Sequence, residues 1–219
     1  MTHPTQTVAD SPVPRTEPVG LTPVALFGRL IGANARYEKF LSDLSGVYQD
    51  EAAHRAALTE DSGEPVYWVE SSAIDQGSGA LTIGVSTIKA GQIGDEYAMT
   101  RGHIHKQHSA AELYFGLSGR GVMLMETMDG ESRAIEITPG VAVHVPGHWI
   151  HRSVNVGPGP FTTLFCYPTD AGQDYGIIRD AGGMKKLVVT DGNGGWALRD
   201  NPAHRSYAPD ANPQRQARQ

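Results

Sequence analysis

The stretch Thr100-Arg-Gly-His-Ile-His-Lys-Gln-His-Ser-Ala-Ala-Glu-Leu-Tyr114 places several metal-binding side chains close together in the chain. His103 and His105 are two residues apart, so on an extended strand both imidazoles point to the same face. Glu112 opens an alternating run that predicts the next strand, with Tyr114 on the same face as the carboxylate. A tight return of the chain would bring Glu112 beside both histidines.

A fourth candidate ligand, His151, follows the stretch Thr138-Pro-Gly-Val-Ala-Val-His-Val-Pro-Gly147. Its two Pro-Gly pairs predict turns on either side of an apolar strand, and His151 begins the strand after the second turn. Imidazoles and a carboxylate without a thiolate suit Fe²⁺, Mn²⁺, Ni²⁺, Co²⁺ or Zn²⁺. Four protein ligands on an octahedral ion leave two neighbouring positions for a substrate with two adjacent oxygens. The predicted ligands of one divalent ion per subunit are His103, His105, Glu112 and His151.

The other histidines near these motifs carry less weight. His108 lies in the polar connection and His144 stands between two valines, so both are expected to be structural or solvent-facing. His148 precedes His151 by three residues and is a candidate for the same cavity.

Longer sequence blocks around these ligands resemble one family closely. They are Gly119-Arg-Gly-Val-Met-Leu-Met125, Pro139-Gly-Val-Ala-Val-His-Val-Pro146, Trp149-Ile-His-Arg-Ser-Val-Asn-Val-Gly157 and Tyr167-Pro-Thr-Asp-Ala-Gly-Gln-Asp-Tyr-Gly176. Together with Gly-His-x-His and Glu-x-Tyr they resemble the cupin-type (archaeal-type) glucose-6-phosphate isomerases from about residue 65 to 202. The resemblance implies a cupin jelly-roll β-barrel, a homodimer, and interconversion of glucose 6-phosphate and fructose 6-phosphate through an enediolate or a hydride shift.

The same resemblance implies roles for individual residues. Glu112 is implied as the catalytic base, and Tyr114 on the same strand face is expected to orient it or to bind a sugar hydroxyl. Fe²⁺ is the ion expected first. Two residues depart from the family pattern: Gln173 stands where a histidine is expected and cannot transfer a proton near neutral pH, and His148 stands where a tyrosine is expected. The implied substrate contacts are Ser86, Thr100, Gly102, Tyr114, Tyr167 and Gln173.

Two other functions remain open on the residues alone. Three histidines and a glutamate with two open positions also suit a metal-dependent dioxygenase. A cupin that binds a sugar phosphate without turning it over is the second alternative, and Gln173 and His148 favour it because both lie where the pocket would be tuned.

Composition limits the class of protein. The chain has 219 residues, a net charge of −6 and no basic run with interleaved aromatics, which argues against nucleic-acid binding. Arg101, Lys106 and Arg152 flank the motifs, either as a local positive pocket or as solvated surface charge. Cys166 lies among apolar neighbours, which predicts a buried thiol and a reducing compartment. With neither a signal peptide nor a run of ~20 apolar residues, we expect a cytoplasmic protein that binds no membrane.

Turn residues and periodicity predict the organisation of the chain. Residues 1–20 are expected to form a disordered or arm-like tail, residues 21–205 a single cupin domain and residues 206–219 a polar tail. Helices are expected at Arg36–Leu44 and at residues 51–58, the latter capped by Asp50. The short β-type runs predict an all-β jelly roll or small barrel with a few flanking helices and a ligand inside. These runs are Val66–Val69, Leu81–Ile88, Glu112–Leu117, Val122–Glu126, Ala134–Ile137, Val141–Val145 and Phe161–Tyr167.

Overall fold

The computed structural model describes residues 16–207, so residues 1–15 and 208–219 of the two predicted tails lie outside the described residues. The strands are β1 (Thr22–Val24), β2 (Arg29–Ile31), β3 (Ala35–Lys39), β4 (Tyr67–Ala73), β5 (Leu81–Ile88), β6 (Gln92–Ile93), β7 (Glu96–Tyr97), β8 (Glu112–Ser118), β9 (Gly121–Thr127), β10 (Ser132–Ile137), β11 (Ala142–Val145), β12 (Trp149–Asn155), β13 (Phe161–Pro168), β14 (Lys186–Thr190) and β15 (Trp196–Asp200). The helices are α1 (Glu51–Thr59) and α2 (Gly176–Asp180), with 3₁₀ turns at Ala25–Phe27 and Leu41–Leu44.

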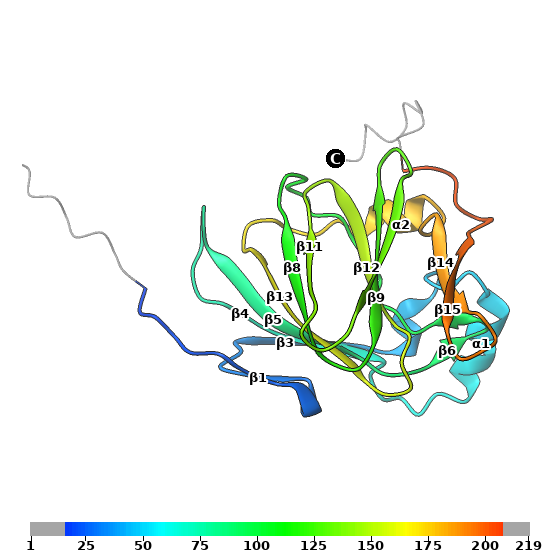
Figure 1. The fold of residues 1–219 in the computed structure, drawn as a ribbon, viewed down its shortest axis with the longest axis horizontal. Helices are drawn as coiled ribbons and strands as arrows, with labels where there is room; N and C mark the ends of the chain where they lie inside the picture. The colour runs from blue at the N-terminus through cyan, green and yellow to red at the C-terminus, as the bar shows by residue number, and fades with distance from the viewer. Residues whose placement is uncertain (1–15, 208–219) are drawn as a thin grey trace, which may run out of the picture.

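Two sheets enclose the core as a barrel (Figure 1). One has six strands in the order β11-β8-β13-β5-β4-β3, and the other has three in the order β10-β9-β12. Isolated bridges at Met99–Val154 and His103–His151 add residues 99–103 to the free edge of β12. These strand pairs confirm the predicted all-β, cupin-type jelly roll.

Alternation along each strand separates the inside of the barrel from the outside. In β8, Glu112 and Tyr114 are buried, whereas Leu113 and Phe115 are 41% and 37% exposed. Each of the seven predicted β-runs lies on an observed strand, with ends that differ by a few residues. Every second residue of a strand therefore lines the interior of the barrel.

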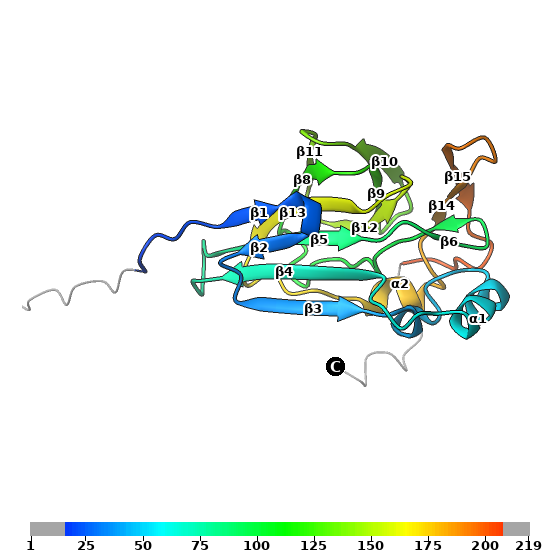
Figure 2. The ribbon, with the colours of Figure 1, turned by 90° about the horizontal axis from the view of Figure 1, so that it is seen from below.

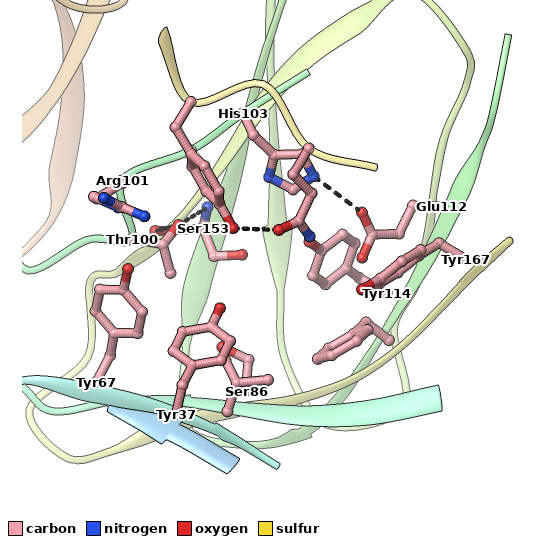
Figure 3. A pocket seen from close by; sticks show the side chains of 15 residues that line it. Tyr37, Tyr67, Ser86, Thr100, Arg101, His103, Glu112, Tyr114, Ser153 and Tyr167 are labelled. Carbon is pink, nitrogen blue, oxygen red and sulfur yellow. Dashed lines mark hydrogen bonds and ion pairs between the residues drawn. The ribbon is translucent and has the colours of Figure 1, made fainter. Parts of the chain in front are cut away.

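The predicted helix Arg36–Leu44 is wrong. Residues 35–39 form β3, which pairs with β4 at the edge of the six-stranded sheet, and only Leu41–Leu44 make a 3₁₀ turn. Arg36 donates to Glu38 and to Glu70 of β4. Positions i and i+2 share one face of a strand but not of a helix, so this pairing fits β3. On the opposite face of β3, Tyr37 points into the barrel (Figure 3).

The second predicted helix is confirmed as α1, whose N-cap Asp50 accepts a hydrogen bond from the Ala53 amide at 2.8 Å. In Figures 1 and 2, α1 lies at one end of the barrel beside β6. The hairpin of β14 and β15 was not predicted, and it packs near the same end (Figure 1). Among residues 16–207, neither helix is long and apolar enough to cross a bilayer.

Glu126 anchors the C-terminal hairpin to the barrel. Its side chain is fully buried in β9, and its carboxylate accepts from the backbone amides of Lys185 and Lys186 at 2.8 Å each and from the Tyr207 hydroxyl. A carboxylate offers only acceptors, so Glu126 can receive all of these donors and also the Ser132 hydroxyl at 3.4 Å. Glu126 therefore holds β14 through its backbone.

We predict that Glu126→Gln lowers the free energy of unfolding by at least about 2 kcal/mol, because the new amide NH₂ group faces backbone donors in a buried site. Urea denaturation monitored by fluorescence measures this change in the free energy of unfolding. Glu131→Gln is the control: Glu131 pairs with Arg133 on the surface, and its loss changes stability by less than about 0.5 kcal/mol. Equal effects of the two substitutions would contradict the anchoring role.

Candidate metal centre and substrate pocket

Four potential ligands come together from three segments of the barrel. Glu112 begins β8, His151 lies in β12, and His103 and His105 lie in the extended segment before β8. The backbones of His103 and His151 exchange two hydrogen bonds, of 3.0 and 2.9 Å, which align the two segments. All four side chains are buried, and their ligand atoms lie within 4.8 Å of one another. The structure thus gathers the predicted ligand set.

The hydrogen bonds around the cluster leave lone pairs pointing inward. The Nδ1 atom of His105 lies 3.1 Å from the Gly172 carbonyl, and Nδ1 of His151 lies 3.1 Å from the Trp149 carbonyl. A neutral imidazole that donates from Nδ1 carries an Nε2 lone pair, which is how proteins orient metal-binding histidines. The Nε2 atoms of His103, His105 and His151 lie 3.8, 3.3 and 3.0 Å from Oε2 of Glu112.

A cation between these atoms would remove the repulsion between their lone pairs. With Nδ1 donating, the Nε2 lone pair of a neutral His151 faces a carboxylate oxygen, and two lone pairs repel. The Nε2 atoms of His103 and His105 are buried without a hydrogen-bond partner. Three nitrogen donors and one carboxylate oxygen suit a divalent first-row ion, so the residues fit a metal.

The electrostatics of the cluster also suit metal binding. Burial lowers the pKa of His103 well below its usual value, so this imidazole is neutral. Burial opposes ionisation of Glu112, but the neighbouring side chains of His105 and His151 outweigh it and lower the pKa of Glu112 to about 2. A carboxyl group whose pKa is lower in the folded than in the unfolded chain stabilises the fold at any pH above its unfolded pKa. The stabilisation from Glu112 is therefore lost only as the pH falls from about 4.5 towards 2. Glu112 is therefore a carboxylate near neutral pH.

A pocket opens beside the cluster, inside the barrel (Figure 3). His103 and Glu112 form part of its wall. All of the substrate contacts implied by the family resemblance line the same pocket: Ser86, Thr100, Gly102, Tyr114, Tyr167 and Gln173. The structure thus brings these residues together, and their contacts with a substrate stay predictions.

Several lining residues were not predicted to contact a substrate. Arg101 was considered either part of a locally positive pocket or a surface charge, and it stands between the two predicted contacts Thr100 and Gly102. Tyr37 was hidden by the incorrect helix, and Tyr175 lies two residues after Gln173, to which its hydroxyl donates. The full set of unpredicted lining residues is Tyr37, Tyr67, Val69, Arg101, Ser153, Phe165 and Tyr175.

Arg101 supplies the positive charge of the pocket. Its guanidinium lies 4.3 Å from the ring centroid of Tyr175, and its Nε atom is buried without a hydrogen-bond partner. Burial raises the pKa of Tyr67 to about 12 and also raises that of Tyr175, so both remain neutral phenols that can donate hydrogen bonds. This part of the pocket presents a cation and hydroxyls, a combination that suits an anion.

The remaining flanking residues divide between surface and core. His148 is exposed and packs against His108 outside the pocket lining, so it does not share the cavity. Lys106 is exposed, as expected of a surface charge, whereas Arg152 is only 3% exposed, and a solvated surface role is wrong for it. Cys166 is half-buried rather than fully buried because its side chain lies on the outer face of β13, beside exposed Leu113.

We predict that the chelator-treated protein binds one equivalent of Zn²⁺ or Mn²⁺ per chain. Because the ion binds the folded cluster, an ion at 100 times its Kd stabilises the fold by about 2.7 kcal/mol, seen as a higher Tm. His105→Ala should weaken binding by more than about 100-fold, beyond the loss expected for an outer hydrogen-bond partner. Exposed His144 on β11 gives the control His144→Ala, which should bind normally. Elemental analysis that finds a full equivalent in His105→Ala would exclude this cluster.

The sequence also matches known proteins over most of its length. A family model described as glucose-6-phosphate isomerase (GPI) matches residues 38–205. "Putative glucose-6-phosphate isomerase 1" of Rhizobium meliloti (strain 1021) is 43% identical over 186 residues, which cover 85% of this chain and 87% of that protein. "Glucose-6-phosphate isomerase" of Thermococcus litoralis is 42% identical over 166 residues, 75% of this chain and 85% of that protein. With the matched blocks carried by a cupin-type barrel, the chain belongs to the cupin-type glucose-6-phosphate isomerase family.

Proposed function

We propose that the protein is a metal-dependent aldose-ketose isomerase that interconverts glucose 6-phosphate and fructose 6-phosphate. The two-ended pocket carries this proposal. Figure 3 shows Glu112 and Tyr167 at one side and Arg101, Thr100 and Tyr67 at the other. An open-chain hexose phosphate has the same polarity, with its carbonyl at one end and a dianion at the other.

Arg101, Thr100 and Gly102 are proposed to hold the phosphate. Among the described residues that line the pocket, Arg101 is the one permanent cation, and its unpartnered Nε atom leaves a donor for an anion. Thr100 supplies a hydroxyl, and Gly102, whose φ is 72°, places no side chain of its own between its backbone and the pocket. Ser86 and Tyr67 add neutral hydroxyl donors. The sugar would then extend from Arg101 towards Glu112.

At the other end, His103, His105, Glu112 and His151 would hold the divalent ion. When bound there, the ion supplies a Lewis acid that stabilises negative charge on adjacent sugar oxygens. Glu112 is the single carboxylate among the described lining residues, so it is the proposed group that moves the proton between C1 and C2. Tyr114 is buried with its hydroxyl against Glu112, and burial raises its pKa well above the usual value, so it donates to the carboxylate and orients it.

The low pKa of Glu112 sets a constraint on this step. A carboxyl group with a pKa of about 2 is a weak base while His105 and His151 contact it. Two routes satisfy the reaction: Glu112 takes the proton once those contacts are relieved, or hydrogen passes directly from carbon to carbon. Gln173 offers no alternative base, because its amide does not titrate.

The resemblance and the donor set also support finer proposals. We propose Fe²⁺ as the cellular ion, with Mn²⁺, Ni²⁺, Co²⁺ and Zn²⁺ as substitutes, since nitrogen and carboxylate donors accept all of them. A cytoplasmic homodimer that serves glycolysis or gluconeogenesis is the assembly and setting that the substrate and the resemblance support.

The test is conversion of fructose 6-phosphate to glucose 6-phosphate by chelator-treated protein, before and after addition of each divalent ion. We predict activity that returns with at least one ion and falls by at least about 1,000-fold in His105→Ala, because the Lewis acid is lost. Oxygen uptake with a catechol or thiol substrate would instead support the dioxygenase alternative. Binding of fructose 6-phosphate by the metal-loaded protein without turnover would support a sensor.

Glucose 6-phosphate deuterated at C2 distinguishes proton transfer through Glu112 from direct transfer of hydrogen between the two carbons. We predict that product formed in H₂O loses deuterium to solvent, because a proton held on Glu112 exchanges before it returns. Mass spectrometry of the product after less than one-tenth conversion measures the loss. Complete retention of deuterium at C1 would contradict the proposed role of Glu112 as the base.

A further inference from the structure

We propose that Arg152 is a positioning residue, which acts from behind the pocket wall to hold Arg101 and Gly102 in the geometry that binds phosphate. This inference rests on the proposed isomerase function and names a residue that does not line the pocket. Its position follows from alternation along β12: His151 points to the metal cluster, and Arg152 points to the opposite face, where it is 3% exposed.

The guanidinium of Arg152 grips the segment that carries the proposed phosphate ligands. Its Nη2 atom donates to the Arg101 carbonyl at 2.7 Å, and its Nη1 atom lies 3.0 Å from the sulfur of Met99. One rigid planar group therefore contacts residues 99 and 101, on either side of Thr100. Thr100 is itself fixed to β12, since its hydroxyl lies 3.3 Å from the backbone amide of Ser153.

Gly102, in the turn before the metal ligands, also packs against Arg152. Its φ is 72°, and a Cβ atom at this position would lie 2.8 Å from Cδ1 of Ile178, 2.9 Å from the His151 carbonyl and 3.1 Å from Cβ of Arg152. The turn thus rests directly on Arg152 and on α2. Loss of the guanidinium would free the Arg101–Gly102 peptide to rotate away from the pocket.

The acidic groups near the charge of Arg152 lie on the side of β12 away from the pocket. Burial lowers the pKa of Arg152, and the nearby carboxylates of Glu96 and Glu126 oppose that shift. Glu96 is 1% exposed, and its Oε2 atom, like Nε of Arg152, is buried without a hydrogen-bond partner. An apolar side chain would fill this space without the cost of desolvating a charge. What the guanidinium adds is a pair of directed donors, one of which holds the Arg101 carbonyl.

A double-mutant cycle tests the coupling. Arg152→Met, Arg152→Lys, Arg101→Met and Arg101→Met/Arg152→Met are compared with wild type for KM and kcat with fructose 6-phosphate, the Kd of inorganic phosphate, and metal content. We expect Arg152→Met to raise KM and the phosphate Kd about tenfold or more, while kcat stays within about threefold and one ion remains bound. Arg152→Lys should restore part of the affinity, because an ammonium can reach the carbonyl but lacks the planar fork.

The double mutant decides between positioning and general stability. If Arg152 acts through Arg101, KM of the double mutant equals that of Arg101→Met within about twofold, whereas independent effects multiply. Arg120→Met, which removes an ion pair with Glu136 outside the pocket, should leave KM unchanged. Multiplying effects, or an Arg152→Lys variant that folds and matches wild type in KM and phosphate Kd, would overturn the proposal. A wild type that binds phosphate without isomerase activity would overturn the proposed function, and the phosphate Kd values would still test Arg152.

Discussion

Three imidazole nitrogens and one carboxylate oxygen converge on the same buried position, and the rest of the barrel keeps them there. The Nε2 lone pairs of His105 and His151 would repel Glu112 in a dry interior unless a cation lies between them. Backbone pairing of His103 with His151 prevents the segments from moving apart. The ligands come from separate parts of the chain, so metal affinity depends on the closed barrel.

The alternation of side chains along each strand, which builds the cluster, also gives the two faces of a strand different roles. On β8, Glu112 and Tyr114 face the pocket while their neighbours face outward. On β12, His151 faces the cluster while Arg152 lies behind the wall and holds the Arg101 backbone. The proposed reacting end and the proposed phosphate end would thus be held by adjacent residues of one strand, which would keep the distance between them constant.

The sequence alone predicts the ligands and most strands, because both follow from local spacing. His-x-His and the alternation after Glu112 need only a period of two. Tyr37 was missed because its strand exists only through pairing with β4, a contact distant in sequence. The place of Arg152 stayed open because nothing local distinguishes a buried arginine from a solvated one; its burial depends on Glu96 and the C-terminal region. The β14–β15 hairpin likewise depends on a distant anchor, the carboxylate of β9.

The most direct test of this account is diffraction at the zinc absorption edge from crystals of the Zn²⁺-loaded protein. The account predicts one anomalous peak per chain, about 2.0–2.2 Å from Nε2 of His103, His105 and His151 and from a carboxylate oxygen of Glu112. A peak held by other residues, or a fully loaded crystal with no peak inside the barrel, would contradict it.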